Sequence, residues 1–309
     1  MSRSLKAHLL LVTITLIWGS TFVLIKAALA DSSPIMLNAV RMSLAAVLLI
    51  IWYRKHLAGL NRRSLAMGCV VGLFLYLGYA FQTAGLRLTT PSKTAFLTGI
   101  STVLVPLIHF AIWRHKVHPW RGLGIVLALC GLFLLTVPAG KEALADFAKV
   151  NFGDILCIAC AFAFAFQIVF LGRATQRFPF EQMAVLQIAV AAVLMIATAP
   201  LLEQPHIHFS GAVIACILIT GIFGTAVAFT VQAWAQQFTP ATHAALIFTL
   251  EPVFAWLTSY IVLGERLGMR SGLGALMILA GVLISELLGS VAHPEAELAA
   301  EAAETGSAG

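Results

Sequence analysis

The sequence predicts an all-α polytopic membrane protein whose ten transmembrane helices form two five-helix repeats of inverted topology. First, 60% of the 309 residues are hydrophobic and only 10% are charged, with a mean hydropathy of +0.96. A soluble domain carries about 25% charged residues, so this composition excludes a soluble enzyme, a disordered chain and a coiled coil. Second, apolar runs recur along the whole chain. Third, motifs of the first half recur in the second half at a spacing of about 150 residues.

Ten apolar segments follow one another, joined by short connections that carry Gly, Pro, Asn, Asp or charged residues. A backbone inside lipid must satisfy its own polar groups, either as a helix or in a closed barrel. Continuous runs of about 20 residues suit a spanning helix and are about twice the length of a barrel strand. We therefore predict ten helices, within residues 7–29, 34–53, 65–87, 91–113, 118–138, 153–173, 181–200, 209–233, 241–263 and 268–289.

The internal repeat divides the chain into two domains and a tail. Four motif pairs keep the same order: Ala45–Leu48 with Ala191–Leu194, Gly72 with Gly221, Thr90-Pro91 with Thr239-Pro240, and Gly122–Gly124 with Gly272–Gly274. Because each half holds an odd number of helices, the second half must start from the opposite side of the membrane. We expect one repeat over 1–140, a second over 141–289 and an acidic, disordered cytoplasmic tail over 290–309. Inverted repeats are typical of secondary transporters, whose substrate site lies near the midplane.

Basic residues predict the orientation. With the N-terminus inside, eleven Lys and Arg residues fall in inner segments and six in outer loops. This bias favours cytoplasmic N- and C-termini in a bacterial-type cytoplasmic (inner) membrane. The net charge of +6 is therefore interpreted as topology control, and we expect no nucleic-acid partner. The five cysteines form neither a disulfide framework nor a zinc set, so we expect no metal and no cofactor.

Three charged residues lie well inside apolar segments: Lys26, Arg41 and Glu251. Lipid penalises charge, which makes each of them a candidate functional residue. Glu251 takes up a proton or contacts substrate in one interpretation; in the other it pairs with Arg41 or Lys26 and only fixes helix packing. Lys26 has a further structural alternative, because its long side chain can reach the outer interface. Pro252 follows Glu251 and predicts a kink in that helix.

Polar side chains line one face of several predicted helices. In the fourth segment, five polar residues fall within a 100° arc, so they face another helix or a cavity: Thr94, Thr98, Ser101, Thr102 and His109. Similar faces carry Thr15, Trp18, Phe22 and Lys26 in the first segment, and Tyr76, Tyr79 and Thr83 in the third. Later segments add buried polar capacity at Gln167, Gln187, Gln232 and Trp234.

The sequence resembles the drug/metabolite transporter superfamily in its ten-helix EamA-type exporter branch. The resemblance spans about 7–289 and rests on these residues: Trp18-Gly19-Ser20-Thr21-Phe22, Arg41, Thr94-Ala95-Phe96-Leu97-Thr98-Gly99 with Val105-Pro106, and Leu250-Glu251-Pro252 with Leu263-Gly264-Glu265-Arg266. The first half departs from the family at Arg114-His115-Lys116, where many members have Gly-Glu-Arg.

The resemblance implies a ten-helix basket around a central cavity, lined mainly by the first, third, fourth, sixth, eighth and ninth helices. It implies export of amino acids, related metabolites or drugs, without catalysis. The residues expected to bind substrate in the cavity are Trp18, Thr21, Tyr76, Tyr79, Thr98, Ser101, Gln167 and Trp234. Helix kinks are expected at Pro106 and Pro252.

The predicted function is a secondary transporter that exports a small molecule by alternating access, surrounded by membrane lipid and coupled to protons. A facilitator or importer that needs no proton is the alternative within the same class. A membrane-embedded enzyme is the rival from another class, but the sequence contains no G-x-S-x-G, no H-E-x-x-H and no paired intramembrane aspartates. A channel or scaffold is the third class, and the sequence carries no signal for an oligomeric state.

Overall fold

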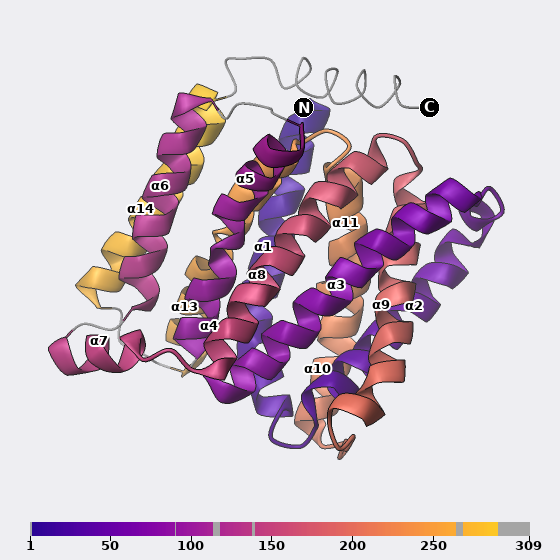
Figure 1. Ribbon diagram of the computed structural model, residues 1–309, viewed down its shortest axis with the longest axis horizontal. Helices are drawn as coiled ribbons and strands as arrows, with labels where there is room; N and C mark the ends of the chain where they lie inside the picture. Colours follow the sequence, from indigo (N-terminus) through magenta and orange to yellow (C-terminus); the bar gives the residue numbers. More distant parts are fainter. Residues whose placement is uncertain (1, 90, 114–117, 138–139, 264–267, 290–309) are drawn as a thin grey trace.

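The computed structural model describes residues 2–89, 91–113, 118–137, 140–263 and 268–289, and Figure 1 shows a bundle of helices. Within these ranges, nine helical stretches are long and apolar enough to cross a membrane, and a shorter apolar helix covers Met269–Ser285. The predicted all-α polytopic class is confirmed. The predicted tail over 290–309 and the segments Arg114–Lys116 and Gly264–Arg266 lie outside the described residues.

The first half of the chain folds into six helices, each beginning at a residue suited to that place. Asn61 starts the third helix with a capping box, in which it and Ser64 each accept from the other's backbone N–H. Pro34 and Pro119 occupy first helical positions, where a missing N–H costs little. The helices are α1 (Arg3–Ala28), α2 (Pro34–Leu57), α3 (Arg62–Leu88), α4 (Pro91–Gly99), α5 (Ser101–Trp113) and α6 (Pro119–Thr136).

The second half repeats this pattern after a short linking helix. Asn151 and Asp154 form a capping box at the start of α8, as Asn61 and Ser64 do at α3. The elements are α7 (Lys141–Ala148), α8 (Phe152–Thr175), α9 (Phe180–Leu202), α10 (Gly211–Gly221), the π-helix η1 (Ile222–Val227), α11 (Ala228–Ala235), α12 (Ala241–Phe248), α13 (Glu251–Leu263) and α14 (Met269–Gly289).

One span in each half is broken at an equivalent place. The fourth span is interrupted at Ile100, between α4 and α5, and the ninth at Thr249 and Leu250, between α12 and α13. Pro252 lies in the first turn of α13, just after the second break, where the backbone N–H that proline lacks would have no partner within the helix. Pro106 lies inside α5, which continues through it, and the break in that span comes earlier.

Glycines bring α6 and α14 into backbone contact along their length. A Cβ placed on Gly124 would lie 2.5 Å from the carbonyl oxygen of Gly281, and one on Gly131 would lie 2.5 Å from that of Gly274. Only glycine fits at such a distance, which is how small residues allow membrane helices to pack closely. The two helices are therefore tightly joined, and they occupy equivalent places in the two halves.

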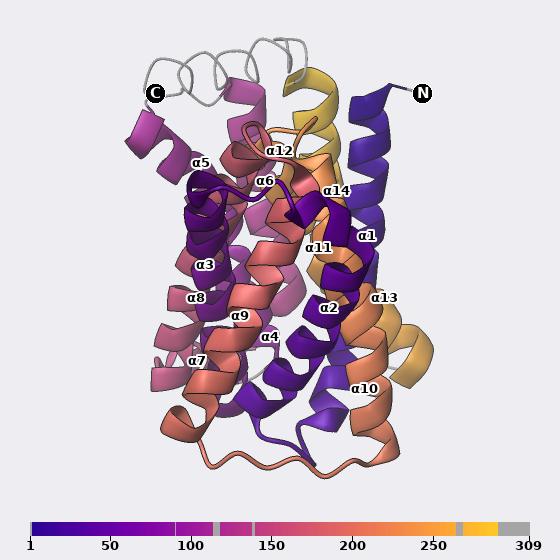
Figure 2. The same cartoon turned by 90° about the vertical axis from the view of Figure 1, so that its right-hand side faces the viewer.

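The start of α1 and the end of α14 lie at the same end of the bundle (Figures 1 and 2), called here the N-terminal end. The α1–α2, α3–α4 and α9–α10 connections lie at the opposite end, together with α7. The most extensive contacts between the halves join α6 with α14, α3 with α8, and α2 with α9. Each half thus depends on the other for its buried surfaces.

Candidate functional site

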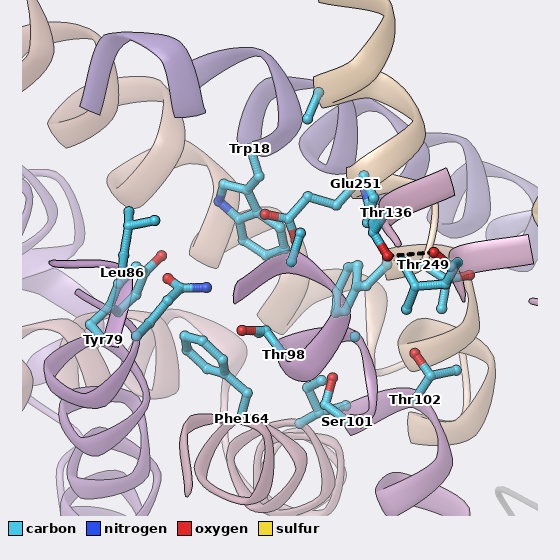
Figure 3. A pocket seen from close by; sticks show the side chains of 18 of the residues that line it. Trp18, Tyr79, Leu86, Thr98, Ser101, Thr102, Thr136, Phe164, Thr249 and Glu251 are labelled. Atoms are coloured by element: carbon cyan, nitrogen blue, oxygen red, sulfur yellow. Dashed lines mark hydrogen bonds between the residues drawn. The ribbon is translucent and has the colours of Figure 1, made fainter. Parts of the chain in front are cut away.

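A central cavity of ≈ 490 Å³ lies between helices of both halves. Its walls come from α1, α3, α4, α5, α6, α8, α11, α12 and α13, including the residues around both helix breaks. The walls combine aromatic rings with hydroxyl and amide groups, and Figure 3 shows Trp18, Tyr79, Thr98, Ser101 and Glu251 arranged around the space. A mixed aromatic and polar lining suits a small amphipathic molecule.

Glu251 is the first residue of α13 and is half-buried on the cavity wall. Because the span breaks just before it, its carboxylate lies at a helix N-terminus, where the helix dipole stabilises negative charge. Among the described residues it has no ion pair within 4.0 Å and no hydrogen bond, so it is paired with neither Lys26 nor Arg41. The break thus presents an acidic group to the cavity without a neutralising partner from the described chain.

Trp18 joins α1 to the π-helix and also faces the cavity. Its indole Nε1 donates to the carbonyl oxygen of Gly224, at 2.8 Å. In a π-helix the regular hydrogen-bond ladder is shifted, which leaves carbonyls for other donors. The ring also packs against Phe229 and Phe248, with centroids 5.4 and 5.2 Å away. Trp18 is therefore held in place from two sides while it lines the cavity.

Arg41 lies behind the cavity wall rather than on it. It is only 5% exposed, and its guanidinium carbon lies 4.6 Å from the ring centroid of Tyr79, which does line the cavity. This cation–π contact offsets part of the cost of burying the charge. Lys26 lines the cavity near the end of α1, exposed, and has no hydrogen bond or ion pair with any residue that the structure describes.

Glutamine side chains close the bundle between the cavity and the N-terminal end. Gln167 and Gln232 line the cavity and face each other across α8 and α11, with amide contacts of 3.3 and 3.5 Å. Further along the same two helices, Gln236 donates to the carbonyl oxygen of Ile168 at 2.9 Å. Gln176 donates to the carbonyl oxygens of Gln236 and Gln237. These contacts hold α8 against α11 and the residues after it, between the cavity and the N-terminal end.

The cavity extends instead toward the opposite end. Lys26 and Leu86, from the last turns of α1 and α3, line both this cavity and a second one of ≈ 480 Å³ at the α1–α2 connection. The two cavities therefore adjoin on the side of the α1–α2 connection.

Three expected cavity residues do not line this space. The Thr21 hydroxyl donates to the carbonyl oxygen of Trp18, and the Tyr76 hydroxyl donates to Thr198 at 3.0 Å. Trp234 packs against Phe238 toward the N-terminal end, with ring centroids 5.1 Å apart. The other five, Trp18, Tyr79, Thr98, Ser101 and Gln167, lie on the cavity wall.

Several lining residues were not singled out by the sequence reasoning. Phe164 lies one helical turn before Gln167, so the period of α8 places the two on one face. Trp256 on α13 also lines the cavity, but it lies five residues beyond Glu251, so the helical period does not place these two on one face. Residues of α6, among them Thr136, also line the cavity. The sequence of α6 has no polar face that would predict this position.

The fold and this cavity define the class: a polytopic membrane transporter, which binds a small-molecule substrate and sits in lipid. The sequence profile of the EamA-like transporter family matches residues 5–137 and 151–287. The chain belongs to the EamA-like transporter family.

Similar proteins agree with this assignment. The chain is 33% identical over 285 residues to an "uncharacterized transporter" of Archaeoglobus fulgidus, covering 92% of this chain and 87% of that one. It is 25% identical to the "uncharacterized transporter YoaV" of Bacillus subtilis, covering 91% and 96%. A solved structure titled "Crystal structure of protein" matches with a TM-score of 0.73 at 19% identity, covering 92% of this chain and 97% of that chain, which supports the fold.

Proposed function

We propose that the chain is a secondary transporter that exports small metabolites, such as amino acids, related compounds or drugs, by alternating access. The observation that carries the proposal is a central cavity lined by helices of both half-chains, which adjoins a second cavity toward one end of the bundle, while glutamine contacts join α8 and α11 toward the other. Alternating access requires a second packing in which the glutamine contacts separate and the opposite end closes. Two halves of similar fold and inverted direction supply two such packings.

The orientation that we propose puts the N-terminal end in the cytoplasm of a bacterial-type inner membrane. The inner segments then carry eleven Lys and Arg residues and the outer loops six, in line with the positive-inside rule. In this orientation the described conformation faces outward, ready to release an exported solute. The glutamine-closed end faces the cytoplasm.

Glu251 is proposed as the proton carrier. It lies on the cavity wall at a helix break, and no ion pair with a described residue holds its charge. A carboxylate in that place can bind a proton from one side and release it to the other as access alternates. Export of the solute would then be driven by proton entry.

The experiment begins with a resistance screen, because the substrate has to be found first. The chain is overexpressed in a sensitive bacterial host, which is exposed to a panel of amino acids, analogues and drugs. A compound that becomes tolerated is then followed in proteoliposomes under an imposed pH gradient. We expect solute movement that depends on the gradient and is abolished in Glu251→Gln.

Glu181→Gln is the matched control, because it removes a carboxylate from the start of α9, where Glu181 lies 3.6 Å from His56 and away from the cavity. This variant should keep the proton dependence. Full transport with full proton dependence in Glu251→Gln would end the carrier role and favour the proton-independent facilitator.

A further inference from the structure

A second cavity lies at the outer mouth of the path and is distinct in its chemistry from the central one. It has a volume of ≈ 480 Å³ and lies at the α1–α2 connection and the end of α3. Three basic side chains from three different segments line it: Lys26, Arg87 and His206. All three are exposed, and no acidic side chain is among its described lining residues.

Three acidic residues lie near this mouth. Asp31, between the lining residues Ala30 and Ser32, makes no side-chain hydrogen bond or ion pair with a described residue, and it is not itself among the lining residues. Glu203 turns toward the start of α2, where it accepts from the backbone N–H of Met36 at 2.8 Å. Asp154 is paired with Lys93 at 2.6 Å and accepts from the Thr89 hydroxyl at 2.7 Å. Asp154 is thus neutralised by Lys93, and Glu203 is held against the start of α2, so the only charged side chains that line the cavity itself are basic.

The lining cations are not held in a direct contact with an acid of the described residues. Neither Lys26 nor Arg87 makes a hydrogen bond or an ion pair with any residue in the described ranges. His206 adds a third positive charge when it is protonated. A concave space lined by one sign of charge concentrates the field and raises the local concentration of the opposite ion. The mouth is therefore built to hold negative charge.

We propose that this mouth, called here the vestibule, is a binding site for the carboxylate group of a small organic anion. Lys26 and Leu86 belong to both cavities, so the vestibule adjoins the central cavity. An ammonium and a guanidinium supply several N–H donors for carboxylate oxygens. The assignment of the anion as an exported solute rests on the proposed function, whereas binding itself does not.

The test measures charge selectivity at the vestibule without using transport. A reporter thiol is introduced by Leu86→Cys in the full chain, purified in an uncharged detergent so that lipid headgroups add no charge. Its reaction rates with anionic methanethiosulfonate ethylsulfonate and cationic methanethiosulfonate ethyltrimethylammonium are compared. Leu144→Cys, on the exposed side of α7 at the same end of the bundle, is the reference position. Labelling of the unsubstituted chain gives the background from Cys69 and Cys130, the exposed native cysteines.

We expect the ratio of anionic to cationic rates at Leu86→Cys to exceed that at Leu144→Cys by on the order of tenfold in about 0.1 M salt. Replacing both vestibule cations, by Lys26→Gln with Arg87→Gln, should remove this difference. Lys141→Gln removes one positive charge from α7, outside the vestibule lining, and should leave it intact. About 1 M salt should reduce the difference by screening.

Binding is separated from a diffuse potential by a protection experiment with a neutral reagent. Benzoate should slow the reaction of N-ethylmaleimide with Leu86→Cys, and benzyl alcohol, of similar shape without the charge, should not. The protection should disappear in Lys26→Gln. Ala30→Cys, at another lining position, serves as a second reporter if Leu86→Cys does not fold.

Two results would overturn the proposal. One is a rate ratio that Lys26→Gln with Arg87→Gln leaves unchanged, since the charge would then come from elsewhere. The other is charge selectivity without protection by benzoate. The basic side chains would then create a positive electrostatic potential but no binding site for a carboxylate. Because no readout involves solute movement, a failure here is distinct from a failure of export in vesicles.

Discussion

At Gly19 the backbone of α1 packs tightly against α13, beside the helix break at Glu251. A Cβ added at Gly19 would lie 2.6 Å from the Glu251 carbonyl oxygen, 2.8 Å from the Cβ of Phe254 and 2.9 Å from the backbone nitrogen of Ala255. Favourable contacts between carbon atoms begin at about 3.5 Å, so Gly19→Ala must push the two helices apart by a large part of an ångström. Two of the three atoms belong to the backbone and cannot rotate away.

The loss of stability in Gly19→Ala can be compared with the effect of the same substitution at a glycine that has no close neighbours. Overpacking of this kind costs about 1–3 kcal/mol. A glycine-to-alanine change where nothing is crowded gains roughly 0.5–1 kcal/mol in a helix. Gly122 in α6 is such a site, because no atom lies within 4 Å of its added Cβ. Because both variants gain this helix preference, we expect Gly19→Ala to be less stable than Gly122→Ala by the overpacking cost, about 1–3 kcal/mol.

Unfolding in mixed micelles, titrated with sodium dodecyl sulfate and followed by circular dichroism, measures the difference. Gly19→Ala should unfold at a clearly lower mole fraction of dodecyl sulfate than the parent chain, and Gly122→Ala at the same fraction or a higher one. Equal midpoints for the two variants would refute the close approach of α1 to α13.

Two further changes test contacts around the path. Trp18→Phe keeps an aromatic ring but removes the indole N–H that donates to the Gly224 carbonyl and part of the ring packed against Phe229 and Phe248, so we expect a loss of more than about 1 kcal/mol of stability. The matched change Trp120→Phe, at a 46% exposed side chain, should cost less, and equal midpoints in the dodecyl sulfate titration would contradict the hydrogen bond. Asp154→Asn leaves the 7% exposed Lys93 without its carboxylate and should cost about 3–5 kcal/mol. Adding Lys93→Met to that variant should recover part of the loss in the same titration, and no recovery would argue against the buried pair.

Much of the fold could be predicted from the sequence, because lipid leaves the backbone few choices. Long apolar runs must be helices there, which explains why the all-α class follows from composition. The breaks are harder to place. Pro252 signals the one between α12 and α13, whereas the break between α4 and α5 has no proline at it. The π-helix Ile222–Val227 carries no signal in its residue types, since it depends on partners such as Trp18.

The cavity residues were harder to predict, for a physical reason. In a soluble protein, the apolar face of a helix points inward, but a membrane helix is apolar toward lipid and toward its neighbours alike. Which side of each helix faces the cavity therefore has to be inferred from a small number of polar side chains. Trp18 and Trp234 illustrate this, since both lie within spans and only Trp18 lines the cavity. The hydroxyls of Thr98 and Ser101, spaced along one face, were a stronger guide.

The glycine contact between α6 and α14 bears on how such a chain could have arisen. Gly124 meets Gly281 while Gly131 meets Gly274, so each helix uses the same seven-residue spacing against the other. The contact is isologous, of the type that two copies of one chain make about a twofold axis. A five-helix ancestor inserted in both orientations would already possess this interface. Gene duplication and fusion would then have needed only a linker, and α7 occupies that place between the halves.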